Sequence, residues 1–265
     1  MFRFTYYSLD SYPTGVSVRE IHPQGGPAAG GTRVRVRGSG LVDQGELLCK
    51  FGEESAVPAS TVDPSEVICV APALGPTSAE SAQPYFNDSA FAPLPLEVTI
   101  NSQLRALTGG DVPFTYYEPD AIRVSRLYPR GGPRAGGTAV TVYGSSFGDL
   151  GAGGPSDTDG SADGGGLKCR FGESELVAAT LITDGGDGAQ TLVCAAPPFE
   201  DPECRPVPLR VTNNFDNPSG GAAISADEVL FTYYDVAQHN DAHGAGTPAM
   251  VLPGTPGYRY ADLRP

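Results

Sequence analysis

Two glycine-rich segments offer the first candidate chemistry, which is the binding of a phosphate group. Gly25, Gly30 and Thr32 approach the pattern G-x-x-x-x-G-K-[ST], in which backbone amides and a lysine hold a nucleotide's phosphates. The segment 131–138 repeats this spacing. However, glycine takes the lysine position in both copies, and a strand pattern follows where a helix N-terminus is needed. We therefore interpret both segments as tight turns that need positive φ, and we expect no cofactor.

Groups that could bind metal or catalyse a reaction are scarce. The chain has 3 His, 5 Cys and no Trp, and no two cysteines form the CxxC unit of a zinc site. The acidic segment 157–163 has Lys168 where a calcium loop needs its last carboxylate. His239 and His243 stand in a segment without helical character, and no Ser, His and acid form a nucleophilic motif. The sequence therefore predicts no metal site and no enzyme activity.

Composition narrows the possible partners. The 31 acidic and 17 basic residues give a net charge of −14, which disfavours binding to nucleic acid or to an anionic membrane surface. No apolar run approaches the roughly 20 residues of a membrane span, so we expect no membrane insertion in this segment. The 35 Gly and 25 Pro are spread along the chain, which favours short strands joined by turns over long helices.

The sequence repeats itself. Residues 16–39 match residues 122–145 at more than half of the positions, and each copy ends in FTYY, at Phe114 and again at Phe231. FTYY also begins at Phe4, so we expect residues 1–13 to be the last strand of a preceding repeat in a longer protein. The second repeat carries extra residues within 151–166, a flexible polar insert.

Apolar residues alternate within each repeat, which is typical of strands with one buried face. Val34 and Val36 alternate with Arg33, Arg35 and Arg37, so the three arginines should form a basic stripe on the solvent face of one strand. Such a stripe could contact an acidic protein or an acidic glycan, or could simply keep the strand soluble. Many short strands separated by Gly and Pro predict an all-β sandwich.

The order GGPxxGGTxVxVxGS, CxFG and FTYY, present twice, resembles the IPT/TIG family of immunoglobulin-like domains. The resemblance implies an all-β fold of two tandem immunoglobulin-like β-sandwich domains. We expect domain 1 at 14–118, domain 2 at 119–236 and an extended tail at 237–265. The family occurs in cell-surface receptors, secreted proteins and intracellular transcription factors, and as an accessory domain of carbohydrate-active enzymes.

The resemblance also gives the cysteines a role. Cys49 with Cys69, and Cys169 with Cys194, stand at equivalent points of the two repeats and resemble the intradomain disulfide of cell-surface members. Buried thiols in a reducing compartment are the alternative. Cys204 has no equivalent in the first repeat, and its role stays open.

These observations favour a non-catalytic structural or adhesive module of an extracellular or cell-surface protein. It would act as a spacer and bind proteins, adjacent repeats or glycans through Arg33, Arg35, Arg37 and, in the tail, Tyr258 and Tyr260. Asn87 is a candidate glycosylation site, because Asn-Asp-Ser is an acceptor motif. The main alternative is an intracellular scaffold module of a cytoskeletal or ciliary assembly. An accessory domain of a carbohydrate-active enzyme ranks below both.

Overall fold

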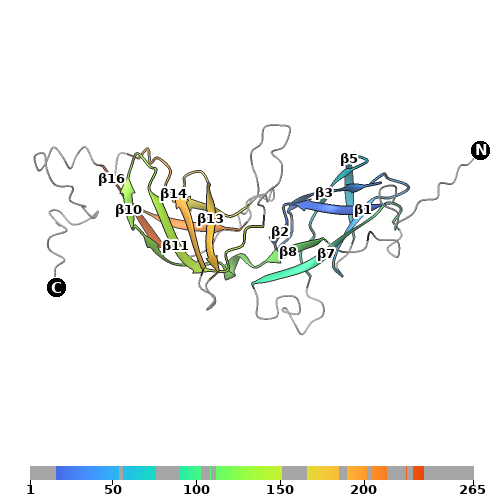
Figure 1. Ribbon diagram of the computed structural model, residues 1–265, viewed down its shortest axis with the longest axis horizontal. Coiled ribbons are helices and arrows are strands. Elements are labelled where there is room, and N and C mark those ends of the chain that lie inside the picture. The colour runs from blue at the N-terminus through green and yellow to red at the C-terminus, as the bar shows by residue number, and fades with distance from the viewer. Residues whose placement is uncertain are drawn as a thin grey trace, which may run out of the picture. The chain divides into compact units, whose positions relative to one another are not determined.

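A computed structural model describes residues 16–53, 56–75, 90–102, 108, 112–150, 166–184, 190–201, 205–213, 225 and 229–235. The chain is all-β, and it divides into two units, one built on strands β1–β8 and the other on β9–β16 (Figure 1). Among these residues the helical structure is a single 3₁₀ turn, η1 (Pro119–Ala121), and no helix is long and apolar enough to cross a membrane.

The first unit contains eight short strands. They are β1 (Ser17–His22), β2 (Gly25–Pro27), β3 (Arg33–Ser39), β4 (Leu48–Phe51), β5 (Val57–Asp63), β6 (Glu66–Val70), β7 (Phe91–Thr99) and β8 (Pro113–Tyr117). Their spatial order is β1-β3-β6-β5-β4-β7-β8-β2. Strand β5 pairs with β4 through its first residues and with β6 through the rest, so it carries the ladder from one layer of the sandwich to the other.

The core of the first unit lies between the two layers. Val34, Val36 and Val67 face it from one layer, and Phe51 and Phe114 face it from the other. The rings of Phe51 and Phe114 pack edge to face, with centroids 5.1 Å apart. The alternation of valine with polar residues in the sequence therefore does mark the buried face of β3.

The second unit repeats this arrangement. Its strands are β9 (Arg123–Tyr128), β10 (Gly131–Pro133), β11 (Ala139–Ser145), β12 (Lys168–Phe171), β13 (Val177–Asp184), β14 (Gln190–Ala195), β15 (Pro206–Thr212) and β16 (Val229–Tyr234). The order β10-β16-β15-β12-β13-β14-β11-β9 is that of the first unit read from the other end. The X-Pro bonds before Pro23 and Pro129 are both cis, at equivalent points of the two units.

The glycine motif has two structural roles. Gly25 and Gly26 belong to strand β2, which pairs in parallel with the FTYY strand β8, so their assignment to a turn was wrong. Gly30 and Gly31 form the turn that follows, with φ of +76° and +85°, as the sequence predicts. A Cβ on Gly26 would lie 2.8 Å from Cβ of Thr32, so the first part of the motif needs glycine for close packing.

Candidate functional site

The predicted basic stripe lies on the outer face of β3, but acidic groups neutralise much of it. Arg35 donates from Nη1 to Oε1 of Glu66 at 2.9 Å, and Arg37 donates from Nε to Oε2 of Glu66 at 2.7 Å. Arg37 also lies 3.3 Å from the carboxylate of Glu20 on β1. The hydrogen bond from Arg37 to Glu66 raises the pKa of the guanidinium above its ordinary value. Together the four side chains form a network of two positive and two negative charges.

Glu66 is the residue that sequence reasoning missed. It is 7 % exposed, and each carboxylate oxygen accepts a hydrogen bond from a different arginine. β6 places it directly opposite Arg37. This pairing across strands had no local sequence signal. Within the stripe, Arg33 is the exposed member, whereas Arg35 and Arg37 are half-buried, which makes the stripe a weaker contact surface than its sequence indicates.

The two cysteine pairs lie in the cores. The structure contains disulfides between Cys49 and Cys69 and between Cys169 and Cys194, with a Cα–Cα separation of 6.3 Å in each. All four side chains are buried. In each unit the bond joins the two strands on either side of the layer-crossing strand, β4 and β6 around β5, and β12 and β14 around β13. Each disulfide therefore fixes the corner at which the two layers meet.

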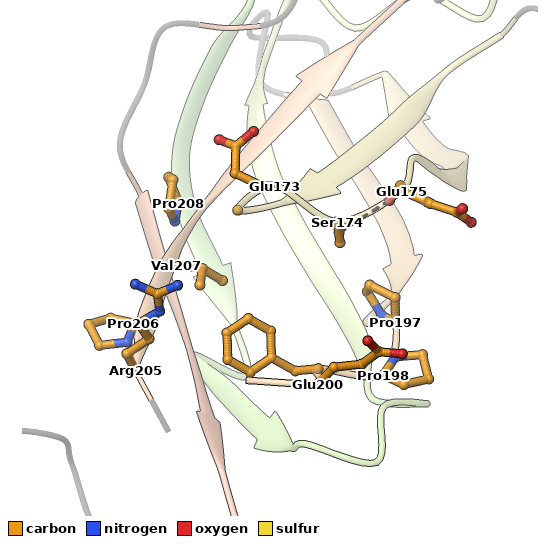
Figure 2. A pocket seen from close by; sticks show the side chains of 12 residues that line it. Glu173, Ser174, Glu175, Pro197, Pro198, Glu200, Arg205, Pro206, Val207 and Pro208 are labelled. Atoms are coloured by element: carbon orange, nitrogen blue, oxygen red, sulfur yellow. Dashed lines mark hydrogen bonds between the residues drawn. The ribbon is translucent and has the colours of Figure 1, made fainter. Parts of the chain in front are cut away.

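The second unit contains a groove of about 730 Å³. Figure 2 shows the side chains that line it. Its walls come from the turn after β12, the segment after β14 and the start of β15. The apolar side chains that line the groove are those of Pro197, Pro198, Phe199, Pro206, Val207 and Pro208. The charged side chains are those of Glu173, Glu175, Glu200 and Arg205. No sequence motif marks this combination, because it joins three separate segments of the chain.

Tyr233 packs against Phe199, one of the residues that line the groove. Its ring stacks on Phe199, with centroids 4.5 Å apart and planes 4° from parallel. Its hydroxyl donates to the carbonyl of Pro197 at 3.1 Å, and burial raises its pKa to about 12. Tyr116 makes the equivalent bond to the carbonyl of Pro72 in the first unit, at 3.0 Å. The first tyrosine of each FTYY motif thus anchors the segment that follows the second disulfide cysteine.

Several predicted site residues lie outside the described part of the chain. These are Asn87, Cys204, Tyr258 and Tyr260, together with residues 1–13, the tail 237–265 and nearly all of the insert. Within the described part, no group of three or more His, Cys, Asp or Glu side chains is arranged to hold a metal ion.

The fold and the buried disulfides define a class, which is the tandem immunoglobulin-like β-sandwich. The IPT/TIG domain family matches residues 17–116 and again residues 123–233, so the chain belongs to this family. Human Fibrocystin-L is similar, at 29% identity over 136 residues, which cover 51% of this chain and 3% of that protein. Human Plexin-B1 is 29% identical over 135 residues, which cover 49% of this chain and 5% of that protein.

Solved structures align with this chain at low sequence identity. The full extracellular region of Plexin A4 aligns over 86% of this chain and 16% of its own length, with 15% identity and a TM-score of 0.48. The chain spans only a small part of the length of the curated relatives that it matches.

Proposed function

We propose that this chain is a non-catalytic module of an extracellular or cell-surface protein, in which two domains act as a spacer and present loops and strand faces to partner proteins. The segments of the two sequence relatives that match this chain are a small part of much longer proteins. The core of each domain is filled by its own side chains, which leaves loops, outer strand faces and the groove for recognition.

The two disulfides are the observation that supports this proposal most strongly. Each domain has one, buried at the same corner of the sandwich. Structural disulfides persist in oxidising compartments, whereas the cytosol keeps thiols reduced. Closing loops of 20 and 25 residues would stabilise each domain by roughly 3 kcal/mol in the chain-entropy description.

The surface favours protein partners over acidic glycans. A glycan with sulfate or carboxylate groups needs accessible positive charge, but Arg35 and Arg37 already bind Glu66. The chain as a whole has a net charge of −14, which repels such a glycan over longer distances.

Peptide mapping of the native protein without reduction tests the proposal. We expect one fragment that joins Cys49 to Cys69 and one that joins Cys169 to Cys194. A Cys204→Ser variant is the control, and should give the same two fragments. Free thiols at all four positions would contradict an extracellular role and support the intracellular scaffold instead.

A further inference from the structure

The groove in the second domain has an apolar floor on which a peptide side chain could pack. Its floor is apolar, since Val207 is buried and Phe199 is half-buried against Tyr233. The stacked pair occupies one face of Phe199 and fixes the ring, so that little side-chain entropy would be lost when a ligand packs there. Figure 2 shows Pro197 and Pro198 on one side of the opening and Pro206 and Pro208 on the other.

The first domain carries a longer side chain at the position equivalent to Val207. Gly52 donates to Pro95 as Gly172 donates to Pro208, which makes Leu94 the counterpart of Val207. A Cβ on Gly52 would meet Cδ1 of Leu94 at 3.0 Å, so the longer side chain extends over that turn. In the second domain the corresponding contact is with Cβ of the shorter Val207, at 3.1 Å. Both side chains pack on the glycine of their turn, and Val207, shorter by one methylene group, also lines the groove.

The charges around the opening select the ligand's sign. Glu173, Glu175 and Glu200 are exposed at the rim, and Figure 2 shows their carboxylates spread around it. Two ion pairs offset part of this charge. The guanidinium of Arg205, which also lines the groove, lies 2.9 Å from the carboxylate of Asp201, and that of Arg170 lies 2.6 Å from the carboxylate of Glu173. Glu175 and Glu200 add two further negative charges. The rim is therefore negative overall, and a cationic ligand complements it.

We propose that this groove binds an extended basic segment of a partner protein, with an aromatic side chain packed on the apolar floor and flanking arginines at the glutamate rim. Arginine suits this rim because its stem packs on apolar surface while its guanidinium hydrogen-bonds carboxylates. The inference rests on the proposed function, since it names one surface through which the module recognises proteins.

Fluorescence anisotropy with a labelled GRYRYRG peptide and the full chain tests this proposal. We expect saturable binding that weakens as salt is raised, because exposed charges contribute to it. A GEYEYEG peptide should not bind. Val207→Leu should weaken binding by about tenfold or more, since it adds a methylene group to a side chain that lines the groove.

A second variant guards against an effect of Val207→Leu on folding. Combined Glu175→Lys and Glu200→Lys should weaken binding by about tenfold with an unchanged melting temperature, because both side chains are exposed. The matched control places the same two charge reversals in the first domain, as Glu46→Lys and Glu53→Lys, and should leave binding unchanged.

Three results would overturn the assignment. The first is equal binding of the two peptides, and the second is unchanged affinity in both groove variants. The third is evidence that something else occupies the groove. Peptide binding that appears only after residues 237–265 are deleted would assign the groove to this chain's own segment. Self-association that Val207→Leu abolishes would assign the groove to a second copy of the chain. Disulfide mapping would be the same in all of these cases, so the failure of this inference is separable from failure of the proposed function.

Discussion

The guanidinium of Arg126 lies over the ring of Tyr143, with its Cζ 3.8 Å from the ring centroid. The two residues face each other across β9 and β11. In the first domain the same register position holds Glu20 and Arg37, which form an ion pair. The two domains thus fill one cross-strand position with different chemistry, and in the second domain the arginine is on the other strand.

This exchange predicts a matched double-mutant cycle in the second domain. Tyr143→Arg should lower the free energy of unfolding by about 1 kcal/mol, because a cation–π contact is lost and two like charges face each other. Adding Arg126→Glu should restore most of it by recreating the pair of the first domain. Urea unfolding measures each step. If the double variant is no more stable than the single variant, the surrounding residues, and not the pair itself, determine which side chains are stable at this cross-strand position.

Glu66→Gln should destabilise the first domain by about 1–3 kcal/mol, because a nearly buried carboxylate that binds two arginines loses its charge. The matched control is Arg33→Glu on the same strand, where the side chain is exposed and the change should stay within about 0.5 kcal/mol. Thermal unfolding of both variants is the measurement. Equal melting temperatures would contradict a stabilising role for the network.

Two neighbouring glycines separate backbone strain from crowding. Gly136 and Gly137 have φ of +80° and +81°, so alanine at either position should cost about 1–2 kcal/mol. A Cβ on Gly136 would also lie 2.7 Å from the nitrogen of Pro198, whereas one on Gly137 would meet nothing within 4 Å. We therefore expect Gly136→Ala to destabilise by about 1–3 kcal/mol more than Gly137→Ala. Similar urea midpoints for the two variants would contradict a steric clash between the added Cβ at position 136 and Pro198.

Alkaline pH should lower the free energy of unfolding of the second domain, because Tyr233 ionises. Burial raises the pKa of this tyrosine from 10.0 to about 12, so the unfolded chain loses the phenolic proton first. The stabilising contribution is complete below pH 10 and is lost as the pH rises from 10 to 12. Tyr233→Phe should cost about 1 kcal/mol at neutral pH, because its hydrogen bond to Pro197 is lost.

The difference between wild type and Tyr233→Phe isolates this effect from the other tyrosines. It should stay constant up to pH 10 and shrink above it, as measured by urea unfolding at each pH. A difference that does not depend on pH would contradict the raised pKa.

The elements that sequence patterns predicted well are those with one buried face. Alternation around Val34 and Val140 identified β3 and β11, and FTYY identified β8 and β16, because in each case every second side chain enters the core. The layer-crossing strand β5 gave no such signal. Most of its side chains are exposed or half-buried, so its role depends on pairing with β4 and β6.

The features that the sequence did not reveal depend on contacts between distant segments. GGP reads as a turn, but Gly25 and Gly26 pair with β8, which lies far along the chain. Glu66 gave no sign that it binds Arg35 and Arg37, because only the strand register brings them together. The groove joins three separate segments of the chain whose sequences have no common period, so only the fold reveals its location.

The parallel pairing of β2 with β8 has a consequence for synthesis on the ribosome. The chain emerges from its N-terminus, so the GGP strand is made early but waits for the FTYY strand, the last to appear in its repeat. Since the same pairing joins β10 to β16, each repeat closes only when its own final strand has left the ribosome. A nascent chain that pauses before Phe114 or Phe231 would expose the unfilled side of a core, and translation through these two points would release each domain as a finished unit.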